Sequence, residues 1–477
     1  MSKGQAKKPH IVLVIARGEA IRNFVFSDFL KELNKLSTIS ILSSIPDGEI
    51  IDYSSPYVKQ IIPLKKYKEN SFVVFFREII HTAHYRWNWT NAVKYYWHRH
   101  NKREEGKFKE KIKLLAWRTL GLPIANKKGL HITTIIERWF SWVFRPTKDF
   151  DKLFDQIKPD IVFNCSHVHG VDADLPMKIA SRMGFKTGTF IFSWDNLFTR
   201  SRIFPKYDFF FTWHNEMRSH LFKIYENEIN LDDIYVTGTP QFDFHFNRSY
   251  YWDRKTLYKK MGLQISRPYI LYTTGMHPVF LEEDKMVNAV IDILKRIKKS
   301  NRPHLVVRTY IKGNSNEMIA LSEKYQNDDD VIFPTIMWDK NWNMPLFEDL
   351  FIYTNLLRYT SLGINAASTV SIELMIHNKP IINLGFEPPN SSLPYWTRFS
   401  QHVDYEHYRP LVKSKGVVVA KSLEELEYSI NRSLNHPKFL EDYQKLFLET
   451  LFNDSLDRFS AKRIGKILNQ KAIQNEK

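Results

Sequence analysis

A short stretch in the second half of the chain carries several side chains that could bind an anion. Ser368, Thr369, Ser371 and Glu373 lie at the start of a short helical pattern, between two patterns of buried strands. The start of a helix has free backbone N–H groups and the positive end of the helix dipole, and hydroxyl groups add donors without bulk. We expect these residues either to cap their own helix or to bind a phosphate group.

Three further groups follow strand patterns in the same half. Gly275 and His277 come after the apolar run that begins at Tyr269, and Arg308 ends the run that begins at His304. In open α/β sheets, ligands collect beyond the carboxyl ends of the strands. An imidazole, a planar guanidinium and helix-start donors suit a phosphate group, and a carboxylate can accept hydrogen bonds from ribose hydroxyls. This half therefore predicts a site for a nucleotide monophosphate or diphosphate.

The first half places histidines and a carboxylate at strand ends. His167 and His169 follow the strand pattern 161–164, and Asp195 follows the pattern 187–192. A histidine in such a place is more often structural than catalytic, so each is a weak signal alone. Together with Asp195 they form a candidate site.

Composition narrows the class of protein. The chain has 477 residues, which favours two domains, and Cys165 is its only cysteine. One cysteine allows neither an internal disulfide nor a cysteine-based zinc site. No apolar run approaches the roughly 20 residues that cross a bilayer, and the apolar run near the N-terminus is too short for a signal peptide. We expect a cytoplasmic protein, with a peripheral position on the inner face of the cell membrane as a second option.

Positive charge gathers in one segment. The net charge is +17, and residues 65–148 contribute 19 Lys and Arg against 6 Asp and Glu, a net +13. Tryptophans and tyrosines are dense there, and 107–120 is amphipathic, with Phe108, Ile112, Leu115 and Leu120 on one side. The segment is expected to be a helical insertion with a solvated basic face, or an element that binds an anionic membrane or an acceptor. A nucleic acid is disfavoured because no nucleic-acid motif accompanies the charge.

Strand and helix patterns alternate along both halves, which predicts an α/β fold of two tandem Rossmann-like domains facing a central cleft. We place the first domain at 1–247, with its insertion at about 65–148, the second domain at 248–445, and a helical tail at 446–477. No G-x-G-x-x-G follows the first strand, so the dinucleotide fingerprint is absent.

Four short motifs carry a resemblance to a known family. They are the segment 236–243 (VTGTPQFD), similar to V-T-G-N/T-P-x-x-D; the Met276-His277-Pro278 strand end; the segment 368–373 (STVSIE) with Lys379-Pro380, similar to S-x-x-x-x-E…K-P; and the segment 404–410 (DYEHYRP), similar to a D/E-H-Y-x-P loop. The chain thereby resembles GT-B glycosyltransferases of the bacterial surface-polysaccharide type. It is also similar to the glycerophosphotransferases of teichoic-acid synthesis and to non-hydrolysing UDP-N-acetylglucosamine 2-epimerases. It departs from the glycerophosphotransferases at Arg308, where their R-x-H-P is replaced by R-T-Y-I.

The resemblance implies a sugar transfer from a nucleotide-activated donor to a cell-surface glycan or a lipid-linked acceptor. The second domain would bind the donor through Gly275, Arg308, Ser368, Thr369, Ser371 and Glu373. The first would bind the acceptor, with Arg17, Gly18, His169, Trp194 and Asn196 on that side. We expect Asp195 as the catalytic base, His167 as the second choice, and His277 with Arg308 beside the leaving phosphate.

The resemblance further implies no cofactor beyond the nucleotide sugar as substrate, and no metal. No D-x-D metal motif stands at a strand end; Asp172-Ala173-Asp174 matches the spacing but lies within a predicted helix start. Three alternatives remain: a nucleotide-sugar epimerase, a polyol-phosphate transferase of the same fold, and a non-enzymatic protein that binds anionic polymers.

Overall fold

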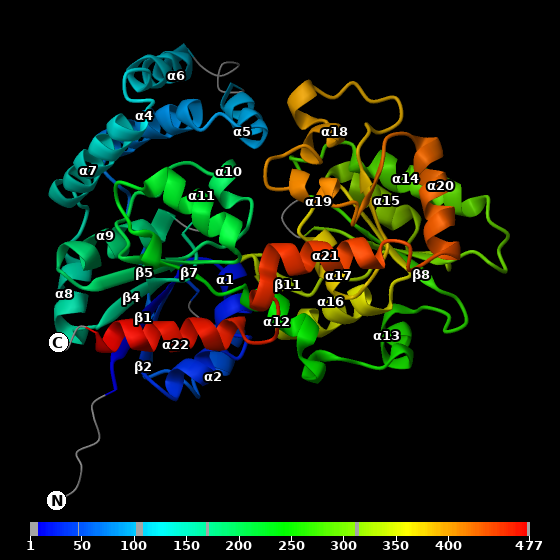
Figure 1. Ribbon diagram of the computed structural model, residues 1–477, viewed down its shortest axis with the longest axis horizontal. Coiled ribbons are helices and arrows are strands. Elements are labelled where there is room, and N and C mark those ends of the chain that lie inside the picture. The colour runs from blue at the N-terminus through cyan, green and yellow to red at the C-terminus, as the bar shows by residue number, and fades with distance from the viewer. Residues whose placement is uncertain (1–7, 46, 102–107, 168–170, 311–313, 475–477) are drawn as a thin grey trace, which may run out of the picture. The chain divides into compact units, whose positions relative to one another are not determined.

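A computed structural model describes the chain except for residues 1–7, 46, 102–107, 168–170, 311–313 and 475–477 (Figure 1). The chain divides into two compact units. The first comprises Met1–Asp243 together with Ser455–Lys477, and the second comprises Phe244–Asp454. The predicted site residue His169 lies outside the described residues.

The first unit is built on a seven-stranded parallel sheet in the order β3-β2-β1-β4-β5-β6-β7. Strands β1, β4 and β6 consist mainly of buried apolar residues, as expected for strands that are covered on both faces. The strands are β1 (His10–Ile15), β2 (Thr38–Ser43), β3 (Gln60–Pro63), β4 (Ile161–Asn164), β5 (Lys186–Phe190), β6 (Phe209–Thr212) and β7 (Ile234–Val236).

Helices connect these strands, and four of them form the basic insertion. The connecting helices are α1 (Glu19–Phe24), α2 (Phe29–Asn34), α3 (Glu49–Ser54), α8 (Asp149–Ile157), α9 (Asp174–Arg182), α10 (Asn196–Thr199), α11 (Asn215–Tyr225) and α12 (Pro240–Phe246), which runs into the second unit. The insertion comprises α4 (Ser71–Trp87), α5 (Asn91–Asn101), α6 (Phe108–Gly121) and α7 (Lys127–Val143).

The second unit contains a six-stranded parallel sheet in the order β10-β9-β8-β13-β14-β15, and a separate two-stranded sheet of β11 and β12. The strands are β8 (Tyr269–Thr273), β9 (His304–Arg308), β10 (Val331–Ile332), β11 (Trp338–Asp339), β12 (Met344–Pro345), β13 (Leu362–Asn365), β14 (Ile381–Leu384) and β15 (Val418–Ala420). The helices are α13 (Arg254–Met261), α14 (Glu283–Lys295), α15 (Asn316–Lys324), α16 (Phe347–Tyr359), α17 (Val370–Ile376), α18 (Phe399–His402), α19 (Arg409–Lys413), α20 (Leu423–Asn435) and α21 (Glu441–Phe452).

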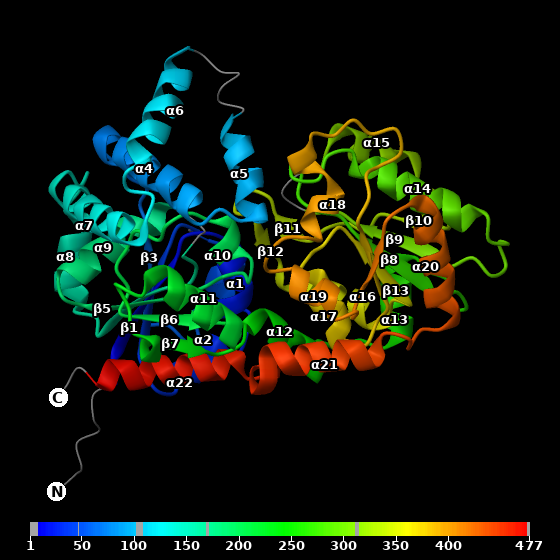
Figure 2. The ribbon, with the colours of Figure 1, turned by 45° about the horizontal axis from the view of Figure 1, so that its top comes forward.

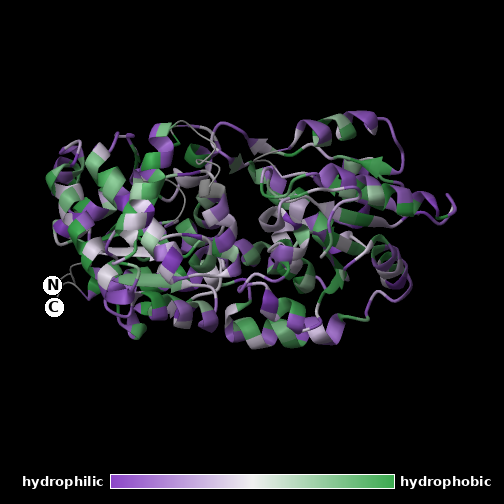
Figure 3. Cartoon of the chain, turned by 90° about the horizontal axis from the view of Figure 1, so that it is seen from above, coloured by the Kyte–Doolittle hydropathy of each residue, from purple (hydrophilic) through white to green (hydrophobic). Residues whose placement is uncertain are grey.

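The predicted tandem α/β architecture is confirmed by these two parallel sheets. Helices carry hydrophilic and hydrophobic residues side by side, as amphipathic helices do (Figure 3). Within the described part of the chain, no helix has the length and apolarity needed to cross a membrane.

Two local features go beyond the sequence patterns. Residues 21–36, whose apolar side chains repeat with a helical period, are divided into α1 and α2, because Ser27 accepts a hydrogen bond from the Phe29 N–H and donates one to the Asn23 carbonyl. On α6, the side that bears Phe108, Ile112 and Leu115 is exposed, whereas the opposite side is buried against α4.

The C-terminal segment returns to the first unit. Its helix α22 (Ser460–Ile473) packs along α2, and the two lie side by side in both views (Figures 1 and 2). A Cβ at Gly465 would lie 3.7 Å from the Leu33 Cα, an ordinary van der Waals distance, so the two helices are in direct contact there. The first unit is therefore completed by residues that lie more than 200 positions after β7.

The motif 236–243 is where this segment attaches. Asp243 accepts hydrogen bonds from the Ala461 N–H (2.9 Å) and the Ser460 N–H (3.2 Å) at the start of α22. The Thr237 carbonyl accepts a hydrogen bond from Arg463 Nε (2.9 Å). Burial raises the pKa of Asp243 to about 7, although these N–H groups oppose the shift. The motif that carries the family resemblance therefore has a structural use.

Gly238 in this motif should tolerate no side chain. It has φ +74, and a Cβ there would lie 2.2 Å from the Ser455 carbonyl oxygen. We expect Gly238→Ala to lower the free energy of unfolding by about 3 kcal/mol or more, measured by urea denaturation. The control is Gly184→Ala, because Gly184 has φ +86 but open space around it. It should cost only about 1 kcal/mol, and equal losses for the two variants would contradict the close packing.

Candidate functional site

The sheet of the second unit reverses its winding between β8 and β13. The chain adds β9 and β10 on one side of β8, and β13, β14 and β15 on the other. Such a reversal leaves room between the loops that follow the two strands, and ligands of α/β proteins bind there. Gly275 and His277 follow β8, Ser368 and Thr369 follow β13, and Arg308 ends the neighbouring strand β9. The structure thus brings five of the predicted residues to one edge of one sheet.

Arg308 offers a donor at this edge. Its Nη2 donates to Asp349 Oδ2 (2.7 Å), and its guanidinium lies 5.0 Å from the centre of the Tyr353 ring. The side chain is 10% exposed, and its Nη1 is buried without a hydrogen-bond partner among the described residues. A buried guanidinium N–H without a partner is costly, and an anion that accepted a hydrogen bond from it would remove that cost.

The turn after β8 is held by a buried acid. The Gly275 N–H donates to both oxygens of Glu283 (2.9 and 3.1 Å), and the Tyr272 hydroxyl also reaches Glu283 (3.3 Å). Burial raises the pKa of Glu283 to about 8, opposed by these hydrogen bonds. A Cβ on Gly275 would lie 1.9 Å from the Phe280 ring, so the position requires glycine. Gly275 therefore shapes the turn, and half-buried His277 lies two residues beyond it.

A buried polar network holds the loop after β13. Asn383 Nδ2 donates to Asn365 Oδ1 (3.0 Å), and the Tyr408 hydroxyl lies 2.9 Å from Asn383 Oδ1 and 2.8 Å from Ser371 Oγ. Asn365 Oδ1 in turn accepts from the Ser368 N–H (3.0 Å). Because all four network side chains are fully buried, their partners fix one loop geometry.

The hydroxyl groups of Ser368, Thr369 and Ser371 have different surroundings in this loop. Ser368 Oγ accepts a hydrogen bond from the Val370 N–H (3.4 Å) in the turn before α17, whose N-cap residue, Thr369, makes no side-chain capping hydrogen bond. Ser368 and Thr369 are half-buried and lie at the surface of the edge. Ser371 is fully buried and belongs to the network beneath the loop. The expectation that Ser371 binds the donor directly is corrected to a positioning role, because its hydroxyl is enclosed and already has partners.

Glu373 also lies deeper than expected. It is 2% exposed; its Oε2 accepts from the Tyr353 hydroxyl (2.5 Å), and its Oε1 lies 3.4 Å from His245 Nε2. His245 Nδ1 is 3.1 Å from His377 Nε2. Both carboxylate oxygens therefore have protein partners, and a ribose could reach Glu373 only after Tyr353 moved.

The sheet of the first unit reverses its winding between β1 and β4. Arg17 and Gly18 follow β1, and His167 follows β4. Arg17 Nε lies 3.4 Å from Glu19 Oε2, with the arginine side chain 39% exposed and the glutamate 7% exposed. The carboxyl edge of the sheet in the first unit therefore also carries residues that the sequence predicted there.

His167 has a defined tautomer. Its Nδ1 lies 3.2 Å from the Phe190 carbonyl oxygen, which can only accept, so the proton is on Nδ1. Burial lowers the pKa of His167 to about 4; the Phe190 carbonyl and the Asp195 carboxylate oppose the shift, and Arg200 adds to it. At neutral pH the imidazole is therefore uncharged, with a lone pair on Nε2 that has no partner among the described residues.

Asp195 is held by the loop that contains it. Oδ2 accepts from the Thr199 hydroxyl (2.8 Å), and Oδ1 accepts from the Ser193 hydroxyl and, at 3.4 Å, from Asn196 Nδ2. Asn196 Oδ1 accepts from the Ser193 N–H (2.9 Å). Asn196 and Trp194 are buried, so they shape this loop from within rather than line an open surface.

The helical insertion contacts this same loop. Asn88 Nδ2 donates to the Leu197 carbonyl (3.4 Å), and the Thr90 hydroxyl donates to the Phe198 carbonyl (3.2 Å). Helix α5 packs against α10, the short helix that Asp195 precedes. The insertion therefore supports the position of Asp195.

The two aspartates of the D-x-D spacing at 172–174 each pair with a basic side chain. Asp174 lies 3.9 Å from Arg77, and Asp172 lies 4.0 Å from Lys66. Among the described residues, no group of three or more His, Cys, Asp or Glu side chains could hold a metal ion.

The sequence did not reveal the residues that hold Arg308 and the loop after β13 in place. Asp349 and Tyr353 contact Arg308 from α16, and Asn365 and Asn383 connect β13 to β14. The asparagines could have been found, because an amide within an apolar strand pattern must have a buried partner. Asp349 and Tyr353 have spacings that any amphipathic helix shows.

Solved structures show which fold this is. The S. aureus MnaA–UDP complex matches with a TM-score of 0.55 at 13% identity, over 98% of this chain and 97% of that chain. The UDP-GlcNAc 2-epimerase of Neisseria meningitidis, bound to UDP-GlcNAc, matches with a TM-score of 0.54 at 11% identity, over 97% of this chain and all of that chain. A glycosyltransferase from Rickettsia africae matches with a TM-score of 0.51 at 13% identity, over 98% and 99% of the two chains. No protein-family model and no curated protein sequence matches the chain.

The chain has the GT-B fold. The predicted resemblance to GT-B enzymes is confirmed at the level of fold by these structures, which include both epimerases and a glycosyltransferase. At these identities the likeness concerns architecture, so the activity must be argued from the residues.

The neutral state of His167 predicts an effect of pH on stability. An unfolded histidine has a pKa near 6.5, whereas burial lowers that of folded His167 to about 4. Between these values the unfolded chain binds more protons, so this residue lowers the free energy of unfolding as pH falls from about 6.5 to about 4. In His167→Gln, the loss between neutral pH and about pH 4.5 should be smaller by about 2 kcal/mol.

Urea denaturation at the two pH values measures this difference. The control is His436→Gln, which removes a histidine outside both edges and should leave the acid-induced loss unchanged. An equal loss in wild type and His167→Gln would contradict the neutral state of half-buried His167.

Proposed function

We propose that the protein is a glycosyltransferase that moves a sugar from a nucleotide-activated donor to a cell-surface glycan or a lipid-linked acceptor. The observation that carries the proposal is Nη1 of Arg308, which is buried without a hydrogen-bond partner among the described residues and lies beside the winding reversal of the second unit. Half-buried Ser368 and Thr369 and the turn at Gly275 follow neighbouring strands of the same sheet. This edge suits the phosphate groups of a nucleotide sugar.

The ligand class is supported by the similar structures. The MnaA structure contains UDP, and the Neisseria epimerase contains UDP-GlcNAc. We propose that the second unit binds the donor and that the first unit binds the acceptor. The sequence predicted the donor domain at 248–445.

In the proposed reaction, an acceptor hydroxyl attacks the anomeric carbon of the sugar. A new glycosidic C–O bond forms, the bond from that carbon to the phosphate oxygen breaks, and the nucleotide leaves. Arg308, with His277 and the Ser368 loop, stabilises the negative charge of the leaving phosphate. The hydroxyl proton goes to a base of the first unit.

We propose His167 as that base, with Asp195 in support. This reverses the order expected from the sequence, because both Asp195 oxygens already accept hydrogen bonds, whereas His167 Nε2 has no hydrogen-bond partner among the described residues. The Asp195 carboxylate raises the pKa of His167 and would stabilise the imidazolium that forms. Asp195 would thus have the electrostatic role of the third residue in a nucleophile–base–acid triad, which stabilises the charged form of the base.

An epimerase is the second candidate, since UDP-GlcNAc 2-epimerases recur among the similar structures. The insertion favours transfer, because its contacts with Leu197 and Phe198 connect a large surface module to the edge that carries His167. A reaction confined to a nucleotide sugar needs no such module. Conversion of UDP-GlcNAc to its 2-epimer without an added acceptor would favour the epimerase instead.

A ligand-induced increase in thermal stability tests the donor site. Wild type with UDP, GDP, CDP, dTDP and CMP should melt at a higher temperature with one nucleotide class, because a ligand that binds only the folded state stabilises it. Arg308→Lys should reduce affinity for that nucleotide about tenfold, since lysine keeps the charge near Asp349 but has a single nitrogen and cannot contact Asp349 and the anion through separate groups as Nη2 and Nη1 can.

The matched control is Arg302→Lys. Arg302 pairs with Asp330 (2.8 Å) near the amino end of β9, away from the carboxyl edge, so its loss should not change nucleotide affinity. No response to any nucleotide would remove the main support for the proposal. A response to CDP alone would favour the polyol-phosphate transferase.

The proposed base pair predicts different effects on transfer and on donor binding. His167→Gln should lower the rate of transfer at least about a hundredfold, and Asp195→Asn by a smaller factor, because the first removes the base and the second its support. Affinity for the nucleotide should stay within about twofold of wild type in both. Asp208→Asn is the control, because Asp208 also accepts from a threonine, Thr187, but lies before β6 at the other edge.

Rates with a radiolabelled donor, and nucleotide affinities by calorimetry, check this. Retained turnover in His167→Gln together with loss in Asp195→Asn would restore Asp195 as the base.

A further inference from the structure

Helix α7 has its polar side buried and its apolar side exposed. Its outward face consists of five large residues at helical spacing: Ile132 (55% exposed), Ile135 (49%), Ile136 (37%), Trp139 (56%) and Val143 (47%). The buried face carries Thr133, Thr134, Glu137 and Ser141 with Leu130. A helix on the surface of a globular unit normally has the opposite arrangement.

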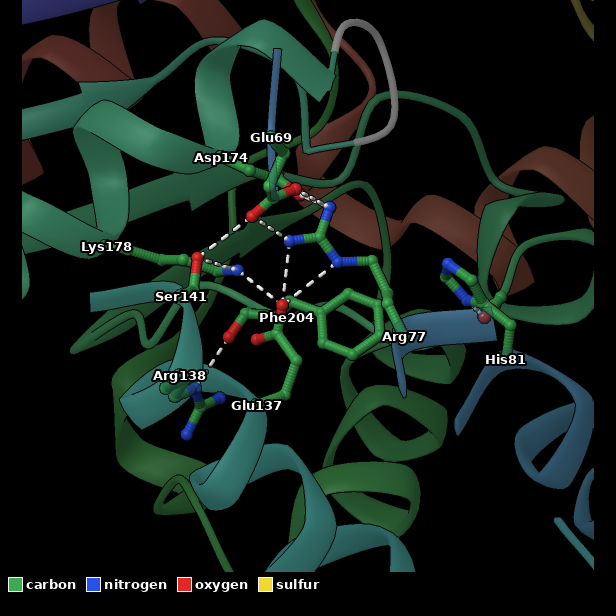
Figure 4. Close-up of polar contacts among 10 residues, drawn as sticks. Glu69, Arg77, His81, Glu137, Arg138, Ser141, Asp174, Lys178 and Phe204 are labelled. Atoms are coloured by element: carbon green, nitrogen blue, oxygen red, sulfur yellow. Dashed lines mark hydrogen bonds and ion pairs between the residues drawn. The ribbon is translucent and has the colours of Figure 1, made fainter. Parts of the chain in front are cut away.

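A buried ion cluster explains how α7 can keep this orientation. Glu137 Oε1 accepts from Arg77 Nη2 and from Lys178 Nζ, both at 2.7 Å, and Ser141 lies 3.1 Å from Lys178. Glu69 joins through Arg77 (2.7 Å) (Figure 4). Burial opposes the charge of Glu137, but Lys178 and Arg77 hold its pKa below the usual value. An ion network in the interior requires these partners, so α7 cannot turn its apolar face inward without breaking it.

Helix α6 shows a second apolar stripe. Phe108 (76% exposed), Ile112 (51%) and Leu115 (67%) follow one another at spacings of four and three residues. The opposite side, with Leu114 and Trp117, packs against Ile79 of α4. We call the exposed faces of α6 and α7 together the apolar face.

The apolar face continues onto α4 at one end. The Phe72 ring lies 4.9 Å from that of Phe140 and 6.1 Å from that of Phe144, and Phe72 and Phe144 are themselves 49% and 43% exposed. Fourteen of the 25 exposed large apolar side chains among the described residues lie between residues 65 and 148. Such a concentration marks an interaction surface rather than scattered exposure.

Positive charge surrounds the apolar face. Lys109, Lys111 and Lys113 of α6 and Lys128 of α7 are exposed. Glu110 is the one exposed acidic residue in the described parts of α4 to α7, since Glu137 is buried and Glu78 half-buried. Exposed apolar and aromatic side chains bordered by lysines suit the boundary between lipid headgroups and acyl chains.

We propose that the apolar face binds the surface of a bilayer that contains anionic phospholipids. The isoleucines and Trp139 enter the headgroup region, and the lysines remain at the phosphates. This inference rests on α4, α6 and α7 alone and does not depend on the proposed reaction.

Charge favours a bilayer over a second copy of the chain as the occupant. A symmetric contact between two apolar faces would bring the same lysines of both copies together, with a net +13 on each segment. An anionic bilayer neutralises that charge, so the apolar and electrostatic contributions act together.

Flotation of the full chain with lipid vesicles tests the proposal. Wild type should float with vesicles of equal parts phosphatidylcholine and phosphatidylglycerol, and the fraction bound should fall with added salt and in vesicles of phosphatidylcholine alone. Ile135→Ser with Trp139→Ser should reduce the partition coefficient at least about tenfold. Lys109→Gln with Lys111→Gln and Lys113→Gln should reduce it only with the anionic vesicles.

The matched control removes one isoleucine and one aromatic residue elsewhere. Ile319 (44% exposed) and Tyr428 (66%) lie on α15 and α20 of the second unit. Ile319→Ser with Tyr428→Ser should float like wild type, and all variants should melt within a few degrees of wild type because the changed side chains are exposed. Absence of flotation in wild type, or undiminished flotation of the α7 variant, would overturn the proposal. It would also be overturned if sedimentation velocity showed a wild-type dimer that the α7 variant disrupts, without any flotation.

Discussion

In a parallel sheet, every strand delivers the residues that follow it to one and the same edge, and in each unit of this protein the winding of the chain reverses at one point along that edge. The reversals lie between β1 and β4 and between β8 and β13. Because the two loops at a reversal leave in opposite directions, they cannot cover the space between them. His167, Gly275 and Ser368 therefore share a common cause for their positions. Each follows a strand beside a reversal, and none needs a contact with the others to be there.

Buried polar networks then determine what these loops present. Asn365, Ser371, Asn383 and Tyr408 satisfy one another beneath the Ser368 loop, and Glu137, Arg77 and Lys178 do so beneath α7. An apolar interior of the same volume could be as stable as an ion network. It would not, however, prevent α7 from turning its isoleucines inward. We infer that these networks serve orientation, since each one fixes a surface that packing alone would not hold.

The sequence allowed most of the strands and their order along the chain to be predicted, because continuous apolar runs such as 11–16 and 269–274 have few other structural uses. The short strands β3, β11 and β12 were not predicted. The sequence also placed Arg308 and Ser368 at strand ends. The sequence could not show how deeply each side chain is buried. Ser371 and Glu373 follow the same loop as Ser368, yet long-range partners from β14, α16 and α12 enclose them. Periodicity likewise revealed apolar residues on α6 but not which side is buried, because that depends on where α4 lies.

The exposed apolar residues are distributed unequally between the two units, and this bears on the reaction. In the second unit they are few and spread over several elements, such as Ile319 on α15, Tyr428 on α20 and Leu446 on α21. In the first, most of them lie in the helical insertion that carries the apolar face, and this insertion contacts the loop of Asp195 through Asn88 and Thr90. A nucleotide sugar is water-soluble and needs no such surface. An acceptor that resides in or on a membrane does need one, and it needs it beside the proposed base, which is where this chain has it. An enzyme with a single soluble substrate would gain nothing from such a surface, so the unequal distribution of exposed apolar residues favours transfer over epimerisation.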